Sequence, residues 1–182
     1  MHIADAQQEM RSAFLGGFMG QLVSGLLWLM SATLWTWGSP RLGITVLVVA
    51  GIFIFPMTQA GLRLVGRPGR VDPGNGLYGL GAQVGLVLPL CLPVVGAAAL
   101  YRLEWFYPAF MVALGAHYLP FVFLYGMRMF GALALILWAG GILLGTWFPL
   151  GATAGGWATA GVLLVFAFVG RGMVLGEERR ES

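Results

Sequence analysis

A few polar side chains interrupt long apolar stretches of the sequence, and these groups could do chemistry. The clearest is His117, in the run ALGAHYLPFVFLYG at 113–126. An imidazole can donate and accept hydrogen bonds and can change charge near neutral pH. Five more polar residues lie within apolar stretches, namely Gln21, Gln59, Gln83, Tyr125 and Arg63. Arg63 follows Gln59 by four residues. These six residues are the candidate binding residues.

The composition indicates what surrounds these groups. The chain has 182 residues, of which 59% are hydrophobic and 9% charged, with a mean hydropathy of +0.85. Soluble proteins carry about a quarter charged residues, enough to cover their surface with polar groups. We therefore predict an integral membrane protein with a single membrane domain over residues 1–182. The basic residues are all arginine, and no motif indicates a nucleic-acid partner.

Six apolar stretches are long enough to cross a bilayer as helices, which takes about 20 residues each. They cover residues 13–37, 42–66, 76–100, 107–127, 129–147 and 157–175. A short amphipathic segment precedes them, and the tail GEERRES reads as soluble. The stretches are too long and too continuously apolar for barrel strands. The predicted fold is all-α, a polytopic helical bundle of six transmembrane helices.

The arginines indicate the orientation of this bundle, because loops rich in arginine stay in the cytoplasm. One predicted side holds Arg11, Arg63, Arg67, Arg70, Arg128, Arg171, Arg179 and Arg180. The other side holds only Arg41 and Arg102. Tryptophans gather at the predicted outer ends of the helices, where they favour the boundary between water and lipid. We predict a multi-pass protein of the bacterial cytoplasmic (inner) membrane with both termini in the cytoplasm.

The alternating direction of the helices brings the polar candidates to similar depths. The three glutamines and Tyr125 fall in the cytoplasmic half, and His117 falls near the middle of the membrane. Pro120 removes a helix hydrogen bond and is expected to free the carbonyl of Ala116 beside the histidine. Polar groups inside a membrane are costly and often functional, but they also join helices by hydrogen bonds. Both interpretations remain open here.

Other classes of site have little support in the sequence. No Asp, Glu or Lys falls within a predicted span, which argues against a proton relay of carboxylates. His2, His117 and Cys91 are too few and too scattered for a metal site, so we predict no metal and no cofactor. No catalytic residues are assigned, and an enzyme is not favoured. An enzyme acting on a lipid headgroup through Arg63, Arg67 and Arg70 remains a third hypothesis without a motif.

Three segments resemble an uncharacterised bacterial integral membrane family, a domain of unknown function. They are FPMTQAGLRLVG (55–66), NGLYGLGAQVGLVLPL (75–90) and YPAFMVALGAHYLPFVFLYGMR (107–128). The matching positions are Pro56, Asn75, Gln83, Tyr107, Pro108, Gly115, Ala116, His117, Leu119, Pro120 and Tyr125. The most specific element is Gly-Ala-His followed by Leu-Pro. The resemblance implies a membrane fold and directs attention to the third and fourth helices, without implying an activity.

Two functions follow from these features. The first is a protein that binds or passes a small neutral or anionic solute through a polar cavity among helices one to four, with Tyr125 and Arg63 nearest the cytoplasmic mouth. The alternative is a structural or accessory subunit that associates with itself, a partner protein or anionic lipid without transport. Glycine-rich helix faces would serve homo-oligomer contacts, and membrane lipids are partners in either case.

Overall fold

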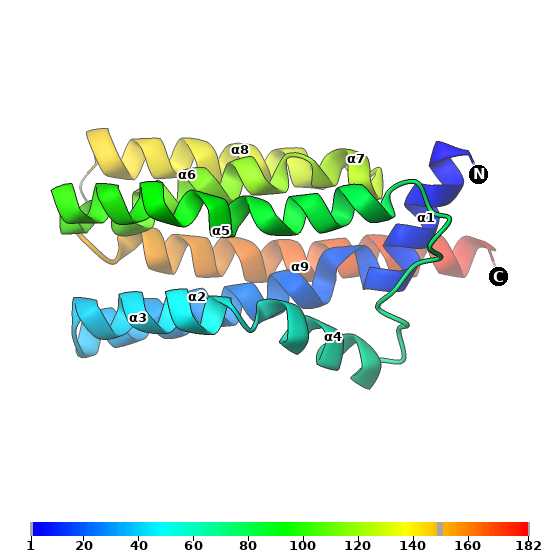
Figure 1. Cartoon of the computed structure of the whole chain (residues 1–182), viewed down its shortest axis with the longest axis horizontal. Helices are drawn as coiled ribbons and strands as arrows, with labels where there is room; N and C mark the ends of the chain where they lie inside the picture. The colour runs from blue at the N-terminus through cyan, green and yellow to red at the C-terminus, as the bar shows by residue number, and fades with distance from the viewer. Residues whose placement is uncertain (1, 149–150, 182) are drawn as a thin grey trace.

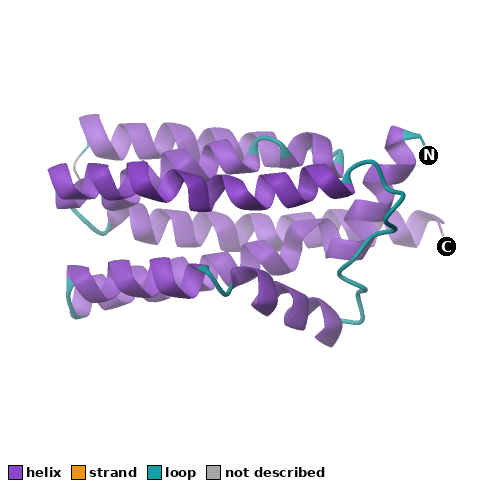
Figure 2. Cartoon of the chain, viewed as in Figure 1, coloured by secondary structure: helices purple, strands orange, loops and turns teal. Residues whose placement is uncertain are grey.

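The long helices of this protein lie side by side along one direction (Figure 1). The computed structural model describes residues 2–148 and 151–181, and within these ranges every regular element is helical (Figure 2). Both chain ends lie at one end of the bundle, which we call the terminal end (Figure 1). The opposite end is called the distal end. The prediction of an all-α bundle is confirmed.

The first predicted span is broken near its start. Helix α1 (Ile3–Phe14) and helix α2 (Phe18–Trp37) are separated by residues with positive φ, namely Leu15, Gly16 and Gly17. Left-handed backbone is costly for residues with a Cβ, so two glycines suit this turn. The break makes α1 a separate amphipathic helix, with Ala6, Met10 and Ala13 buried on one side. The span predicted as 13–37 is helical as α2 only from Phe18 onward.

The second predicted span is also broken. Helix α3 (Pro40–Gly51) begins at an N-cap, where the Ser39 hydroxyl accepts a hydrogen bond from the Leu42 N–H at 3.2 Å. Helix α4 (Ile54–Leu64) follows at an angle of 62° to α3. Pro56 lies in the first turn of α4, and its missing N–H cannot extend α3. The stretch 42–66 is therefore a bent pair of helices rather than one straight span.

The remaining helices return along the bundle. They are α5 (Tyr78–Tyr101), α6 (Phe106–Tyr118), α7 (Phe121–Tyr125), α8 (Met129–Ile142) and α9 (Ala154–Glu181). Helix α9 is longer than predicted, because the tail expected to be soluble continues the helix to Glu181. Within the described ranges, five nearly continuous helical stretches are long and apolar enough to cross a membrane, and the bent pair makes a sixth if it counts as one span. The five are Ile3–Trp37, Tyr78–Tyr101, Leu103–Tyr125, Met129–Trp147 and Ala154–Arg180.

Two helix pairs form the centre of the bundle, α2 with α9 and α6 with α8. Glycine allows the second pair to approach closely, since a Cβ at Gly115 would lie 2.7 Å from the Ala134 carbonyl oxygen. The bent pair α3–α4 packs mainly on α2, and α5 packs mainly on α6. The fully buried Leu133, Leu137 and Leu163 come from α8 and α9. Helix α2 lies against α9 and is the best-covered span, with 61% of its apolar window buried inside the bundle.

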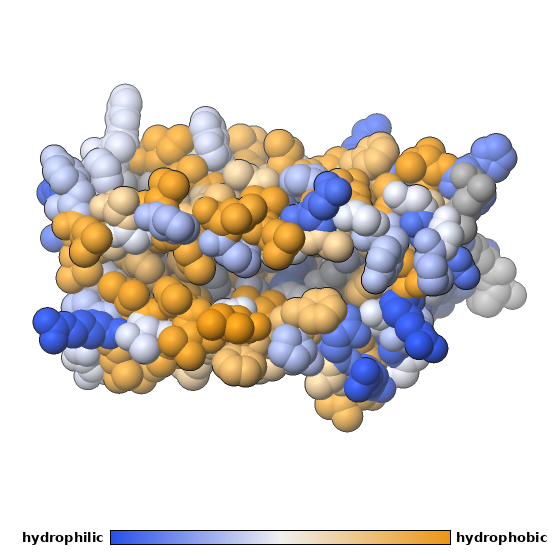
Figure 3. Space-filling model, in the orientation of Figure 1, coloured by the Kyte–Doolittle hydropathy of each residue, from blue (hydrophilic) through white to orange (hydrophobic). Residues whose placement is uncertain are grey.

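The outer helices leave apolar side chains uncovered. Phe55 and Leu64 of α4 are 71% and 88% exposed, and Leu90 of α5 is 75% exposed. On the face shown in Figure 3, apolar side chains cover the middle of the bundle, and hydrophilic ones gather toward the terminal end. Contiguous apolar surface of this kind suits contact with lipid. The chain is a multi-pass membrane protein by the length and apolar character of its helices.

Candidate anion-binding site

Two adjacent glutamates fix the last turns of α9 to other segments. The Arg11 guanidinium of α1 donates to Glu177 through Nε at 3.0 Å and Nη2 at 2.6 Å. Arg67, just after α4, donates to Glu178 through Nη1 at 2.6 Å and Nη2 at 2.7 Å. Two-pronged pairs of arginine and carboxylate define geometry as well as charge. The terminal end of the bundle is therefore held by two ion pairs on consecutive residues.

The loop between α4 and α5 is attached to α1 through Glu9. Its carboxylate accepts the Asp72 N–H at 2.6 Å and the Asn75 side-chain amide at 2.8 Å. The same Asn75 amide donates to the Ala6 carbonyl, and its oxygen accepts the Leu77 N–H where α5 is about to begin. Asn75 is 2% exposed, and its bonds to Ala6 and Leu77 are buried. A loop that sequence alone shows only as a polar turn thus has a defined position.

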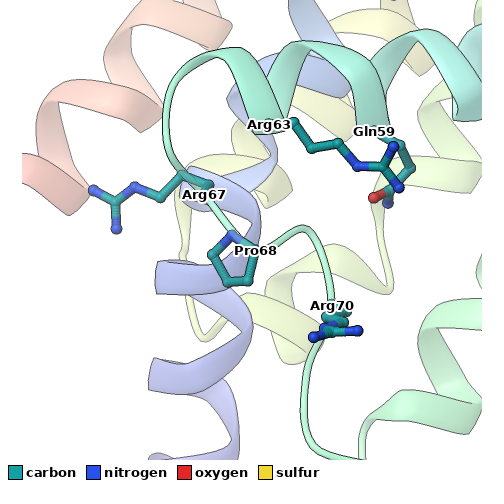
Figure 4. A pocket seen from close by; sticks show the side chains of 5 residues that line it. All are labelled: Gln59, Arg63, Arg67, Pro68 and Arg70. Carbon is teal, nitrogen blue, oxygen red and sulfur yellow. The ribbon is translucent and has the colours of Figure 1, made fainter.

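A cavity of about 390 Å³ lies between the end of α4 and this loop (Figure 4). Its lining residues are Gln59, Arg63, Arg67, Pro68 and Arg70. Helix α4 supplies Gln59 and Arg63, whose spacing of four residues puts both on one face of the helix. The Gln59 amide donates to the Gly69 carbonyl at 3.0 Å, which joins the helix to the loop. We call this cavity the arginine pocket.

The charge of the arginine pocket is positive, because its lining contains three arginines and no carboxylate. Arg67 is paired with Glu178, and the hydrogen bonds that it donates to that carboxylate raise the pKa of Arg67 above its ordinary value. Arg63 and Arg70 are exposed, and among the described residues neither has a carboxylate within ion-pair distance. Two guanidinium groups therefore remain available at the pocket.

The chemistry that this lining offers is recognition of an anion. Guanidinium groups present several N–H donors in a plane and suit the oxygens of phosphate or carboxylate. The lining side chains include no histidine, thiol or carboxylate that could act as a base or a nucleophile. The pocket is thus equipped for binding and orientation rather than for proton transfer.

The structure brings two of the six predicted binding residues together, Gln59 and Arg63. Gln21 lies elsewhere, 2% exposed in the core, and neither atom of its amide has a hydrogen-bond partner in the described part of the chain. Tyr125 is 5% exposed and stacks on Phe130 with ring centroids 5.4 Å apart. Neither residue lines the arginine pocket or a smaller pocket beside Glu177 and Glu178.

His117 and Gln83 also lie outside the arginine pocket. The His117 ring contacts Phe121 edge to face at 5.1 Å and interacts with the Val84 backbone of α5. Its Nδ1 has no partner among the described residues. Gln83 is exposed on α5. Pro120 was expected to leave the Ala116 carbonyl without a hydrogen bond. That expectation is wrong, because this carbonyl accepts the Leu119 N–H at 3.4 Å.

Two further pairs of residues were not among the six predicted binding residues. Arg67 and Arg70 stand in the sequence RPGR, a predicted turn, and were named only in the third hypothesis, that of an enzyme acting on a lipid headgroup. Ser31 and Tyr107, both fully buried and hydrogen-bonded at 2.7 Å, were also missed. Serine and tyrosine are common in membrane helices, so their types gave no signal. Contacts between distant residues decide these sites.

Comparison of the sequence with known proteins assigns the chain to a family. No curated protein and no solved structure matches the chain. The resemblance seen over residues 55–130 is confirmed and extends further, to residues 3–171, because a family model covers that range. The chain belongs to DUF7010, a family of unknown function.

Proposed function

We propose that this membrane protein binds the phosphate group of an anionic lipid in the arginine pocket. The observation that carries the proposal is the lining itself, which has three arginines and no carboxylate at the end of an apolar helix. Arg63 and Arg70 contact the phosphate oxygens, and Gln59 positions the loop through its bond to Gly69. The ligand chemistry is that of a phosphate ester with its charge at the membrane surface.

The position of the pocket supports a ligand from the membrane. The pocket lies at the terminal end, and the arginine distribution of the sequence favours that end as cytoplasmic. The cytoplasmic leaflet carries anionic lipids, which attract arginine at its surface. Phe55, Met57 and Leu64 on the same helix as Arg63 are exposed and apolar. A lipid can place its headgroup on the arginines and its chains along such a flank, which a free anion cannot use.

Passage of a solute, the other function predicted from the sequence, has less support. The arginine pocket lies at one end of the bundle and belongs to the surface between α4 and the following loop (Figure 4). It therefore supports binding at the membrane boundary and is not evidence for a route across it. Among the two functions, association with anionic lipid is the one favoured by a specific set of residues.

Binding of phosphatidylglycerol tests the proposal. The full chain is purified and mixed with nanodiscs or detergent micelles containing phosphatidylglycerol or phosphatidylcholine, and bound lipid is counted by native mass spectrometry. Arg63→Gln and Arg70→Gln should each reduce phosphatidylglycerol binding about five-fold, as each arginine near the surface is worth about 1 kcal/mol. Phosphatidylcholine, which is neutral overall, should bind weakly to all forms.

The matched control is Arg128→Gln, which removes an exposed arginine that does not line the pocket. It should leave binding unchanged. An equal loss with Arg128→Gln would mean that binding reflects general surface charge and would contradict the proposal. A separate arm adds inorganic phosphate at the concentration of the lipid. If inorganic phosphate alone displaces phosphatidylglycerol at that concentration, the ligand is a soluble anion and the lipid assignment is wrong.

A further inference from the structure

Arg67 belongs to two arrangements at once. It lines the arginine pocket, yet its guanidinium group points away from Arg63 and Arg70 toward α9 (Figure 4). There it donates to both carboxylate oxygens of Glu178 and, more weakly, to the Ser12 hydroxyl at 3.3 Å. Arg67, the third arginine of the pocket, is therefore already paired with a carboxylate of the protein itself.

The Glu178 pair is placed where an external anion can compete with it. The side chains of Arg67 and Glu178 are 20% and 34% exposed, so water and salt already weaken their attraction. An arginine side chain is long, and rotation about its bonds can turn the head while its backbone stays in place. A phosphate held by Arg63 and Arg70 offers additional oxygens and a full negative charge to the same guanidinium.

We propose that Glu178 is an internal competitor for Arg67, so that filling the arginine pocket releases the last turns of α9 from the loop after α4. This inference rests on the proposed lipid binding and adds its regulation. In the empty pocket, Arg67 holds Glu178 and anchors α9. In the filled pocket, Arg67 turns toward the phosphate, and Glu178 loses its arginine partner, while the Ser12 hydroxyl can still donate to it at 3.4 Å. The binding site is thereby coupled to the terminal end of α9.

The neighbouring pair provides a control within the same turn. Glu177 makes the same kind of two-pronged ion pair, but its partner is Arg11 of α1, which does not line the arginine pocket. Removing the charge of Glu177 changes the net charge near the pocket as much as removing that of Glu178. Only Glu178 is bonded to a pocket arginine. The two substitutions therefore separate competition for Arg67 from a general electrostatic effect.

The test compares Glu178→Gln and Glu177→Gln in the full chain, with phosphatidylglycerol in nanodiscs as the probe. Glu178→Gln should tighten lipid binding by about two- to five-fold, the range expected for a partly exposed ion pair. Glu177→Gln should leave binding within the error of the wild type. Unchanged binding in Glu178→Gln, or equal tightening in Glu177→Gln, overturns the competition. Thermal unfolding of both variants checks that they remain folded.

Hydrogen–deuterium exchange gives a second and independent readout. Adding phosphatidylglycerol to the wild type should speed exchange of backbone amides in 176–181, and Arg63→Gln with Arg70→Gln should abolish that change. Slower or unchanged exchange in this segment on lipid binding overturns the inference. If lipid binding depends on Arg63 and Arg70 but ignores Glu178, only the competition fails. If binding ignores Arg63 and Arg70, the proposed function itself fails.

Discussion

The Tyr107 hydroxyl lies 2.7 Å from the Ser31 hydroxyl, and both side chains are completely buried. Ser31 donates its own proton to the Gly43 carbonyl at 2.8 Å. A hydroxyl has one proton to give, so Tyr107 is the donor to Ser31. The chain of bonds joins α6, α2 and α3. It attaches the bent pair to the core at a point where lipid could not satisfy these groups.

Removing the tyrosine hydroxyl tests this link. Tyr107→Phe keeps the ring packing on Trp28 and Trp35 but loses one buried hydrogen bond, at a cost of about 1 kcal/mol. The midpoint of thermal unfolding in detergent should fall accordingly. Tyr101→Phe is the control, because Tyr101 is 77% exposed and should tolerate the change. A Tyr107→Phe protein as stable as the wild type would contradict the importance of the bond.

A glycine contact between α6 and α8 makes a second prediction. A Cβ at Gly115 would lie 2.7 Å from the Ala134 oxygen and 2.8 Å from the Trp138 nitrogen, and both atoms are backbone. The helices must therefore move apart in Gly115→Ala, at a cost of about 1–3 kcal/mol. The unfolding midpoint in detergent should drop clearly.

The control for that prediction is Gly96→Ala on α5, where a Cβ would meet nothing within 4 Å. Alanine favours the helix over glycine by about 1 kcal/mol, so this variant should be as stable as the wild type or more so. Equal destabilisation by the two substitutions would show that helix backbone effects, rather than the close approach of α6 and α8, determine the result.

Apolar periodicity predicted the helices well, and it failed where single residues redirect the chain. The all-α bundle follows from long apolar stretches, since only helices satisfy their backbone over such lengths in lipid. The break at Gly16 did not follow, because glycine is frequent within membrane helices, whereas a proline such as Pro56 is expected to kink its helix. Only packing shows whether a glycine bends the helix. The bend at Pro56 is what gives α4 a separate direction at the arginine pocket.

The candidate site was predicted less well, because the sequence indicates only how deep a residue lies in the membrane. It does not indicate which side of the helix faces which neighbour. Gln21 and Gln59 are at similar depths by sequence, yet Gln21 is in the core and Gln59 lines the arginine pocket. The rotation of each helix about its own axis decides which polar groups meet. The pairing of Arg67 with Glu178 joins residues 111 positions apart. No local pattern encodes such a contact.

The buried amide of Gln21 gives a third prediction. Its two polar atoms lack partners in the described part of the chain, and an unsatisfied amide in a core costs about 1–3 kcal/mol. Gln21→Met keeps the length of the side chain and removes that cost, so the unfolding midpoint should rise. Gln83→Met, at an exposed position on α5, should change it little. A lower midpoint for Gln21→Met would indicate that its amide binds water or a ligand.

The orientation of the bundle is a fourth prediction, and cysteine labelling in cells can measure it. In a Cys91→Ser background, Gly76→Cys introduces a thiol in the exposed loop before α5, and Glu104→Cys introduces one at the distal end. A membrane-impermeant maleimide should label the second variant in intact cells and the first only after permeabilisation. The reverse pattern would place the arginine pocket outside the cytoplasm. The proposal of lipid binding would then lose the argument that the cytoplasmic leaflet supplies anionic lipids to the pocket.

The role of His117 is the fifth prediction, and it separates the two locations suggested for a ligand. His117 lies against Phe121 and the Val84 backbone, and it does not line the arginine pocket. His117→Leu should therefore leave phosphatidylglycerol binding unchanged, while Arg63→Gln reduces it.

Lipid binding by His117→Leu is measured by native mass spectrometry, with its unfolding midpoint recorded to detect a change in packing. A loss of binding at an unchanged midpoint would move the ligand from the terminal end to the centre of the bundle. That result would favour the polar cavity predicted from the sequence. A lower midpoint with unchanged binding would instead assign the histidine to helix packing, because its contacts then matter for stability alone.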